Sequence, residues 1–275
     1  MKNIEKSTVI CSTYNNIKFL ELVLDSLLDQ SDKDFHLIIA DDGSRSETKD
    51  LIDSFSKKAD FEVSHIWHED RGWKKAEIHN KAINTVKTDH IIFIDGDCIL
   101  GKNFIRDHRS IYRTERENFV FMGRRVELGQ KISESLKISN YKKLLSPFSF
   151  DFILSSLSRD THGGGRVITL RNLFLRKLFS ADKVNDLLGA NFSTTKKKLF
   201  EINGFNEYTD ELGGSEDGDL FVRFRNTGTK LIGKKYFAPM FHIFHKRPDR
   251  AVSDDYYQEI LKKKDFVWAE RGLKK

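Results

Sequence analysis

Cysteine is scarce in this sequence, which has only Cys11 and Cys98 among its 275 residues. Both lie in apolar runs that are typical of strands, and two buried thiols do not make a disulfide framework. This scarcity excludes the class of small secreted domains that disulfides stabilise. We therefore expect the protein to work in a reducing compartment, which indicates the cytoplasm.

Long apolar segments are also missing. No run of about 18 apolar residues occurs, so no membrane span is expected. The first seven residues lack the apolar region of a signal peptide, and no internal repeat is evident. The sequence therefore predicts a soluble, cytoplasmic protein, which could still contact the face of a membrane.

Charge is unevenly distributed along the chain. Lys and Arg total 47 and Asp and Glu total 41, which gives a formal net charge of +6. Residues 131–200 contain 13 basic and 5 acidic residues, whereas the rest of the chain is close to neutral. A local basic field suits an anionic partner, although a solvated lysine-rich surface gives the same pattern. No basic motif interleaved with aromatic residues accompanies it, so we expect no nucleic-acid partner.

The first hundred residues alternate short apolar runs with amphipathic segments. Apolar runs predict strands at 8–11, 35–40, 61–67 and 90–94, and helices are expected over 19–28, from about 46, and over 75–86. Continuous apolar strands separated by helices predict an α/β fold with a mostly parallel central sheet flanked by helices. Ligands bind beyond the carboxyl ends of such strands. The polar clusters that follow the strands should therefore converge; they are residues 13–15, 41–44, 68–72 and 95–97.

The second half of the chain is less regular. Residues 155–165 include three consecutive glycines and predict a loop. Residues 166–179 are apolar and basic, but their basic side chains do not share one helical face, so a membrane-lying helix is weakly indicated. Further on we expect a strand at 189–194, a helix that ends at Gly204, a short α/β unit at 220–233 and a charged helix from Ser253.

Two carboxylates follow the fourth predicted strand, in the sequence Asp95-Gly96-Asp97. Carboxylates two residues apart at a strand end can share a hard divalent cation, Mg²⁺ or Mn²⁺, with a diphosphate that the cation neutralises. Such a triplet occurs by chance in many proteins. Its position directly after an apolar strand favours a cation site.

Three carboxylates are crowded into four residues at Glu216, Asp217 and Asp219, after a pair of glycines. Crowded carboxylates repel one another, so they are tolerated on a solvated surface, near a cation, or where one of them exchanges a proton. One of them could remove the proton of a substrate hydroxyl as a general base. An acidic first turn also stabilises a helix N-terminus, and the two roles are compatible.

His242 and His245 are three residues apart, among aromatic and apolar side chains. This spacing suits a pair of metal ligands or a contact with a substrate, and a structural role is the alternative. A histidine can join Asp97 at one cation only if the chain folds back to the edge of the sheet.

The order and spacing of these motifs resemble the family 2 glycosyltransferases of the GT-A fold. The similarity covers roughly residues 7–245, and residues 203–219 also resemble the galactosyltransferase-type segment of chondroitin polymerases and β-1,4-galactosyltransferases. The motifs that carry the resemblance are Ser12-Thr13-Tyr14-Asn15-Asn16, Asp41-Asp42-Gly43-Ser44, Arg71-Gly72, Asp95-Gly96-Asp97, Gly204-Phe205-Asn206-Glu207 and Glu216-Asp217.

The resemblance implies a site for a UDP-sugar donor with Mn²⁺ or Mg²⁺ as cofactor. Thr13, Tyr14 and Asp41 would line the nucleobase and ribose, and Arg71 would lie near the base or the diphosphate. The full set of donor-binding residues implied in this way is Thr13, Tyr14, Asn15, Asp41, Asp42, Arg71, Asp95 and Gly96.

The resemblance also implies the chemistry. Asp97 would ligate the cation with His242, and His245 is the less favoured ligand. Asp217 would be the general base of an inverting, single-displacement reaction, with Glu216 binding the acceptor or the donor sugar. The acceptor would be the hydroxyl of a saccharide or of a lipid-linked molecule, in the synthesis of bacterial surface polysaccharide such as lipopolysaccharide or capsule.

On this interpretation the chain is one continuous domain with two halves and a tail. Residues 1–130 would bind the nucleotide sugar, residues 131–252 would bind the acceptor and hold the catalytic groups and a basic insertion, and residues 253–275 would form a helical tail. The basic stretch 131–198 would dock the enzyme on an anionic membrane or on a lipid-linked acceptor, at the inner face of the cell membrane.

Two other functions fit parts of the sequence. Residues 93–98 match a phosphatase motif of the haloacid-dehalogenase type, with Asp95 as nucleophile. That motif normally ends the first strand of its sheet and continues with Thr or Val where Ile99 stands here. The second alternative is an inactive module that binds a nucleotide or a glycan. Asp217 argues against it, because binding alone needs no base.

Overall fold

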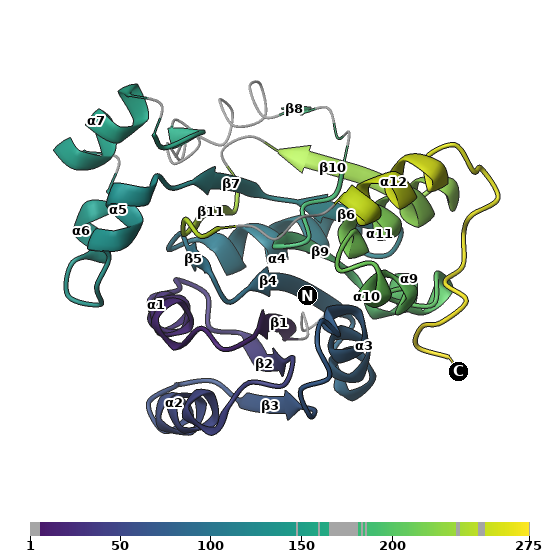
Figure 1. Cartoon of the computed structure of the whole chain (residues 1–275), viewed down its shortest axis with the longest axis horizontal. Helices are drawn as coiled ribbons and strands as arrows, with labels where there is room; N and C mark the ends of the chain where they lie inside the picture. Colours follow the sequence, from purple (N-terminus) through teal and green to yellow (C-terminus); the bar gives the residue numbers. More distant parts are fainter. Residues whose placement is uncertain are drawn as a thin grey trace.

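Strands and helices alternate through the first hundred residues of the computed structural model (Figure 1). The elements are β1 (Ser7–Thr13), α1 (Ile17–Leu28), β2 (Phe35–Asp41), α2 (Ser46–Ser56), β3 (Val63–Trp67), α3 (Lys75–Thr85) and β4 (His90–Asp95). Each of these four strands begins and ends within two residues of its predicted bounds. The structure describes residues 6–146, 148–158, 160–164, 181–182, 184, 186–234, 237–246 and 251–274.

Shorter elements make up the second half. They are β5 (Cys98–Leu100), α4 (Phe104–Glu115), β6 (Phe119–Met122), β7 (Arg124–Glu127), α5 (Gln130–Ser135), α6 (Tyr141–Leu144), α7 (Phe150–Leu157), β8 (Ala181–Asp182), β9 (Asn191–Thr195), α9 (Lys196–Glu201), α10 (Tyr208–Glu211), α11 (Glu216–Asn226), β10 (Lys230–Lys234), β11 (Pro239–His242) and α12 (Ala251–Ile260).

Two predictions in this half need correction. The loop predicted at 155–165 begins only after α7, which continues through Leu157, because its apolar residues recur at helical rather than random spacing. The tail predicted as a helix from Ser253 is helical only as far as Ile260, and residues 261–274 contain no helix. The apolar and basic segment 166–179 lies outside the described residues.

The main sheet has eight strands in the order β3-β2-β1-β4-β9-β6-β10-β8. The four strands of the first half are all parallel, with Val9 of β1 paired to Leu37 and Ile92 on its two neighbours. β9 enters the sheet antiparallel to both β4 and β6, and β10 is again parallel to β6. The prediction of a mostly parallel central sheet is confirmed.

Apolar side chains cover both faces of this sheet. On β1, Val9 and Cys11 belong to the core that packs under α1, α2 and α4, whereas Ile10 belongs to the core under α3, α9 and α11. Successive strand residues point to opposite faces, so a strand buried on both faces must be apolar throughout. Both cysteines are buried and free, as the sequence predicted.

A second, three-stranded sheet lies beyond the end of β4, in the order β5-β11-β7. β11 pairs antiparallel with β5, and the register sets His242 opposite Cys98. The backbone N–H of Ile243 donates a hydrogen bond to the carbonyl of Asp97 at 2.9 Å. The chain therefore folds back to the sheet edge, as a shared site for Asp97 and the histidines requires.

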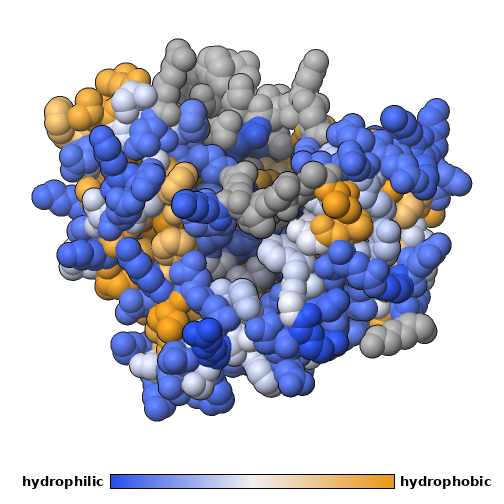
Figure 2. Space-filling model, in the orientation of Figure 1, coloured by the Kyte–Doolittle hydropathy of each residue, from blue (hydrophilic) through white to orange (hydrophobic). Residues whose placement is uncertain are grey.

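Among the described residues, no helix is both long enough and apolar enough to cross a membrane. The face drawn in Figure 2 is mostly hydrophilic, with apolar side chains gathered at its upper left, over α7 in Figure 1.

Candidate active site

Lys75 is the first residue of α3, and its ammonium lies between two carboxylates from distant parts of the chain. Its Nζ is 3.0 Å from an oxygen of Asp95 and 3.1 Å from an oxygen of Glu216. Burial alone would lower the pKa of Lys75, but the two carboxylates outweigh burial and raise it well above its usual value. The ammonium therefore stays charged and joins the end of β4 to the start of α11.

Asp95 and Gly96 connect this cluster to the end of β1. The hydroxyl of Ser12 donates to Asp95 at 2.6 Å, and the N–H of Gly96 donates to the Ser12 carbonyl at 2.7 Å. A Cβ atom at position 96 would lie 2.8 Å from that carbonyl oxygen, so only glycine fits without a shift. Thr13 is buried beside Gly96, and its hydroxyl has no hydrogen-bond partner in the part of the chain that the structure describes.

Asp217 follows Glu216 in the first turn of α11, but the pKa values of the two carboxyl groups are shifted in opposite directions. Burial, and after it the negative charge of Glu216, raise the pKa of Asp217 to about 6, while Lys75 acts in the opposite direction. For Glu216, burial would also raise the pKa, but Lys75 outweighs burial and lowers it. A carboxylate with a pKa just below neutral is suited to accept a proton.

The turn before α11 fixes where these two carboxylates lie. Gly213 and Ser215 both have positive φ, and the hydroxyl of Ser215 donates to the carbonyl of Ser253 at 2.7 Å. The N–H of Gly218 then donates to Asp217 at 2.9 Å. The left-handed backbone conformation is uncommon for serine, and the hydrogen bond to α12 stabilises it here.

Asp219, the third of the crowded carboxylates, has a structural role. It is fully buried and forms an ion pair with Arg223, which is also fully buried. It also accepts hydrogen bonds from Asn206 at 3.0 Å and from the hydroxyl of Tyr256 at 2.7 Å. Its oxygens are therefore used within the core.

Asp97, His242 and His245 form a separate cluster next to Asp95. The Nε2 atoms of His245 and His242 lie 3.1 and 3.5 Å from the same oxygen of Asp97. One ligand atom from each of the three side chains lies within 4.8 Å of the others. Sequence reasoning favoured His242 over His245, and both reach this position.

The surroundings of this cluster suit a divalent cation. Glu127 on β7 holds the Nδ1 atom of His242 at 2.8 Å, which turns Nε2 towards Asp97. A carboxylate behind a histidine orients it as a metal ligand in the same way. Burial alone would lower the pKa of His242, but the hydrogen bonds to Asp97 and Glu127 outweigh burial and raise it to about 9. The carboxylates thus attract positive charge, which a divalent cation can supply.

The loops after β1, β2 and β3 meet, as the sequence predicted. The N–H of Asn15 donates to the hydroxyl of Ser44 at 2.8 Å, and the N–H of Arg45 donates to the Asn15 side chain at 3.0 Å. Tyr14 is half exposed, and its hydroxyl donates to Asp70 at 3.0 Å. Thr13, Tyr14 and Asn15 therefore lie beside the second and third of the predicted clusters.

Asp41 is buried under these loops. One of its oxygens accepts the N–H of Ser44 at 2.9 Å, and the other pairs with His65 at 2.9 Å. Both oxygens are thus used within the protein, so Asp41 can shape a donor pocket without presenting a free carboxylate to it.

Asp42 and Arg71 are joined to one polar network. Asp42 pairs with His68 at 2.7 Å and accepts the N–H of Lys74 at 2.9 Å. Arg71 is half exposed and pairs with Glu77 at 2.7 Å, and Glu77 lies 3.9 Å from the other nitrogen of His68. The exposed guanidinium remains close enough to the loops to meet an anionic ligand.

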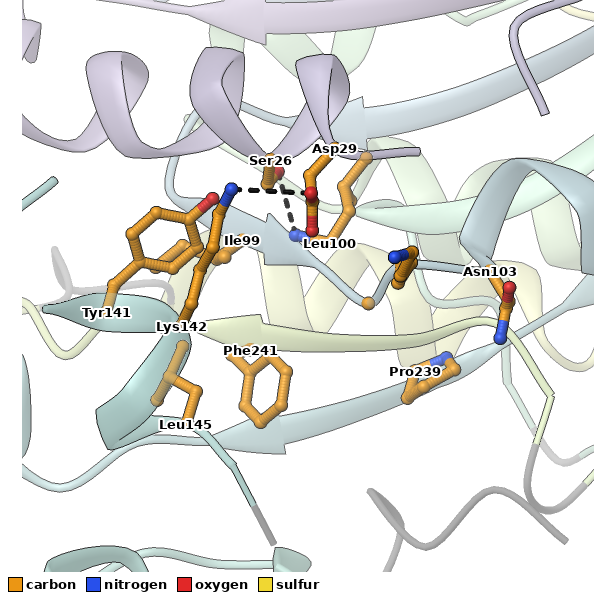
Figure 3. Close-up of a pocket in the computed structure, with 12 residues that line it drawn as sticks. Ser26, Asp29, Ile99, Leu100, Asn103, Tyr141, Lys142, Leu145, Pro239 and Phe241 are labelled. Atoms are coloured by element: carbon orange, nitrogen blue, oxygen red, sulfur yellow. Dashed lines mark hydrogen bonds and ion pairs between the residues drawn. The ribbon is translucent and has the colours of Figure 1, made fainter. Parts of the chain in front are cut away.

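A cavity of about 250 Å³ lies on the reverse face of β5 and β11 (Figure 3). Phe241 and Tyr141 line it, and Lys142 forms an ion pair across it with Asp29 at 3.4 Å. Successive side chains of a strand point to opposite faces, so Phe241 faces this cavity and His242 faces Asp97. The cavity is not part of the candidate active site.

Three residues of the site were missed by sequence reasoning. Lys75 and Glu127 belong to no recognised motif. The sequence indicated Lys75 only indirectly, because the crowded carboxylates need a positive charge nearby. Asp210 accepts the N–H groups of Ala76 and Glu77 at 2.8 and 3.1 Å, and so caps the helix that presents Lys75. Burial raises the pKa of Asp210 to about 7.

Solved structures with the same fold are glycosyltransferases. A mannosyltransferase from Pyrobaculum calidifontis, in complex with GDP-Man and Mn²⁺, superposes with a TM-score of 0.60 over 90% of this chain and 59% of that one, at 15% identity. Staphylococcus aureus TarS, in complex with UDP-GlcNAc, does so with a TM-score of 0.58 over 93% and 64%, at 16% identity. The fold is the GT-A fold of glycosyltransferases.

Family models place the chain more closely. The glycosyl transferase family 2 model matches residues 8–173, and a model described as the N-terminal domain of galactosyltransferase matches residues 172–246. The chain therefore belongs to glycosyltransferase family 2, which leaves no support for the phosphatase alternative. Chondroitin synthase of Escherichia coli is 20% identical over 95% of this chain, and the match spans only 38% of that enzyme.

The different roles of Asp217 and Asp219 can be separated by stability. Asp219→Asn is expected to lower the free energy of unfolding by about 3 kcal/mol, because it leaves Arg223 buried without its counter-ion. Asp217→Asn is expected to leave stability at pH 7.5 unchanged or slightly higher, because the raised pKa of Asp217 marks an unfavourable buried charge. Urea unfolding measures both; equal losses in the two variants would contradict the assignment.

Proposed function

We propose that this protein is a metal-dependent, inverting glycosyltransferase that moves a sugar from a UDP-sugar to a hydroxyl of a saccharide or lipid-linked acceptor, in the synthesis of a bacterial surface polysaccharide. One observation carries the proposal. Lys75 pairs with Asp95, two residues before Asp97 of the cation-ligand cluster, and with Glu216, which precedes the raised-pKa carboxylate of Asp217.

The names and titles of related proteins support the donor and the acceptor. TarS has been solved with UDP and with UDP-GlcNAc, and its name describes transfer to poly(ribitol-phosphate). Chondroitin synthase and a teichoic acid polymerase are named for other surface polymers. The mannosyltransferase complex contains GDP-Man, so a GDP-sugar should be tested as a donor alongside the UDP-sugars.

Asp97 and His242 would hold the cation, with His245 within reach and Glu127 orienting His242. A divalent cation bound there would stabilise the negative charge that develops on the leaving diphosphate. Thr13, Tyr14 and Arg71 would contact the nucleotide, and Asn15, Asp41 and Asp42 would shape the loops that receive it. The buried hydroxyl of Thr13 has no hydrogen-bond partner among the described residues, so a hydroxyl or phosphate of the nucleotide would satisfy it.

Asp217 would remove the proton from the acceptor hydroxyl as its oxygen attacks the anomeric carbon. A bond forms between that oxygen and the anomeric carbon, the bond from the anomeric carbon to the phosphate oxygen breaks, and UDP leaves with the bonding electrons. A single displacement of this kind inverts the configuration of the sugar. Lys75 keeps Glu216 ionised, so that Glu216 can accept hydrogen bonds from sugar hydroxyls beside the base.

A screen of nucleotide sugars for Mn²⁺-dependent release of nucleoside diphosphate tests this function. We expect release of UDP from at least one UDP-sugar, its loss when EDTA removes the metal, and no release from GDP-mannose. Asp217→Asn is expected to lower kcat by about 10²- to 10⁴-fold, the usual contribution of a general base, with the affinity for UDP unchanged.

The exposed Asp50 on α2 offers a matched control, because Asp50→Asn removes an equal charge from a residue outside the candidate active site. It should turn over like the wild type. Release that proceeds equally with Asp217→Asn would remove the base from the mechanism. Donor binding without any turnover would favour the inactive binding module.

The pKa of Asp217 predicts the acid limb of the pH profile. Only the ionised carboxylate accepts a proton, so kcat/KM should fall about tenfold per pH unit below about pH 6 and level off above it. Lys75→Met removes a charge that lowers this pKa, so the limb should move to higher pH, whereas Lys75→Arg should keep it in place. If the acid limb of kcat/KM lies at the same pH in Lys75→Met as in the wild type, a group other than Asp217 titrates there.

A further inference from the structure

The helix α7 exposes an apolar face at one edge of the molecule (Figure 2). Phe150, Ile153, Leu154 and Leu157 recur at the spacing of a single helical face, and they are 75%, 42%, 53% and 75% exposed. Phe148, in the turn before the helix, is 91% exposed. Single exposed apolar residues are ordinary, but five gathered on one short element mark an interaction surface.

The opposite face of α7 is firmly packed. Phe152 is buried, and its ring meets that of Phe241 edge-on, with 6.1 Å between centroids. Ser155 is also buried, and its hydroxyl is within hydrogen-bond distance of Asp160 and Thr161. A helix of a soluble protein normally buries its apolar face. The body of the protein covers one face, and nothing in the described part of the chain covers the other.

Three lysines belong to the group of short helices that contains α7. Lys131 lies on α5, Lys137 follows that helix, and Lys143 lies on α6, in the group of short helices that contains α7 (Figure 1). All three are exposed, and none forms an ion pair with another described residue. Glu134, Asp151 and Asp160 are exposed in the same group, so the three lysines alone do not make it basic. The stretch 131–200 as a whole carries 13 basic and 5 acidic residues. An apolar helix face within a basic stretch is complementary to an anionic lipid surface, which offers both acyl chains and phosphates.

We propose that α7 docks this protein on a bilayer that contains anionic lipid, with Phe148, Phe150 and Leu157 entering the boundary between headgroups and acyl chains. The sequence alone pointed to the basic stretch 131–198; the structure adds the apolar element and locates it. A second copy of this chain fits the face less well. A helix of eight residues is about 12 Å long, too short to supply the roughly 800 Å² per partner of a stable interface.

Co-sedimentation with vesicles tests the docking. The wild-type protein should bind vesicles of phosphatidylglycerol and phosphatidylcholine. The double variant Phe150→Ser with Leu157→Ser should lose about tenfold in vesicle affinity, because two exposed apolar side chains no longer enter the bilayer. Val252→Ser, which changes a 65% exposed apolar residue on α12, is the matched control and should bind like the wild type.

A second pair of changes tests the charge. Lys131→Gln with Lys143→Gln should weaken binding to the anionic vesicles, and salt should weaken wild-type binding in the same way. The proposal would be overturned if the wild-type protein did not bind the vesicles, or if the Phe150/Leu157 variant bound them with wild-type affinity. A variant that instead lost self-association in analytical ultracentrifugation would assign the face to a second copy.

The docking proposal does not depend on the sugar transfer proposed above, so experiments can contradict one proposal without contradicting the other. The Phe150/Leu157 variant should retain wild-type turnover of the donor with a soluble acceptor, which also shows that it folds. Vesicle binding without any turnover would remove the proposed function and keep the docking surface.

Discussion

A buried ammonium between two carboxylates holds the candidate active site together. Lys75 joins Asp95 at the end of β4 to Glu216 at the start of α11, although these segments lie far apart in the sequence. Without it, the negative groups at this sheet edge would repel one another. The same contact separates two adjacent carboxylates, because Lys75 keeps Glu216 ionised while burial beside that charge raises the pKa of Asp217. The pKa values of the neighbouring carboxyl groups Glu216 and Asp217 are therefore shifted in opposite directions.

The sheets determine where the other half of the site lies. Parallel strands bring the loops after β1, β2, β3 and β4 to one edge, and β11 returns beside β5 so that His242 faces Asp97. β7 runs parallel to β11 and supplies Glu127 behind that histidine. The proposed cation ligands and their support are thus positioned by backbone pairing, whereas side chains such as Asp41 hold the loops proposed to bind the sugar donor.

Much of this arrangement could be predicted from the sequence. The alternation of apolar and amphipathic segments gave the strand positions, and the parallel sheet gave the convergence of the polar clusters. Lys75 could not be distinguished from Lys74, because the difference depends on partners distant in the sequence. Only the family resemblance separated Asp217 from Asp219, whose burial against Arg223 gives no signal in the sequence. The last turn of α7 was predicted as part of a loop, because Ser155, Ser156 and the three glycines that follow are typical of loops.

If one edge of the sheet binds a cation and a nucleotide diphosphate beside Asp217, crystals grown with Mn²⁺ and UDP will show both there. We expect anomalous scattering to give one strong manganese peak within coordination distance of Asp97 and His242, with the diphosphate between the metal and the first turn of α11. A manganese peak elsewhere, or UDP bound away from Asp97, would contradict this prediction.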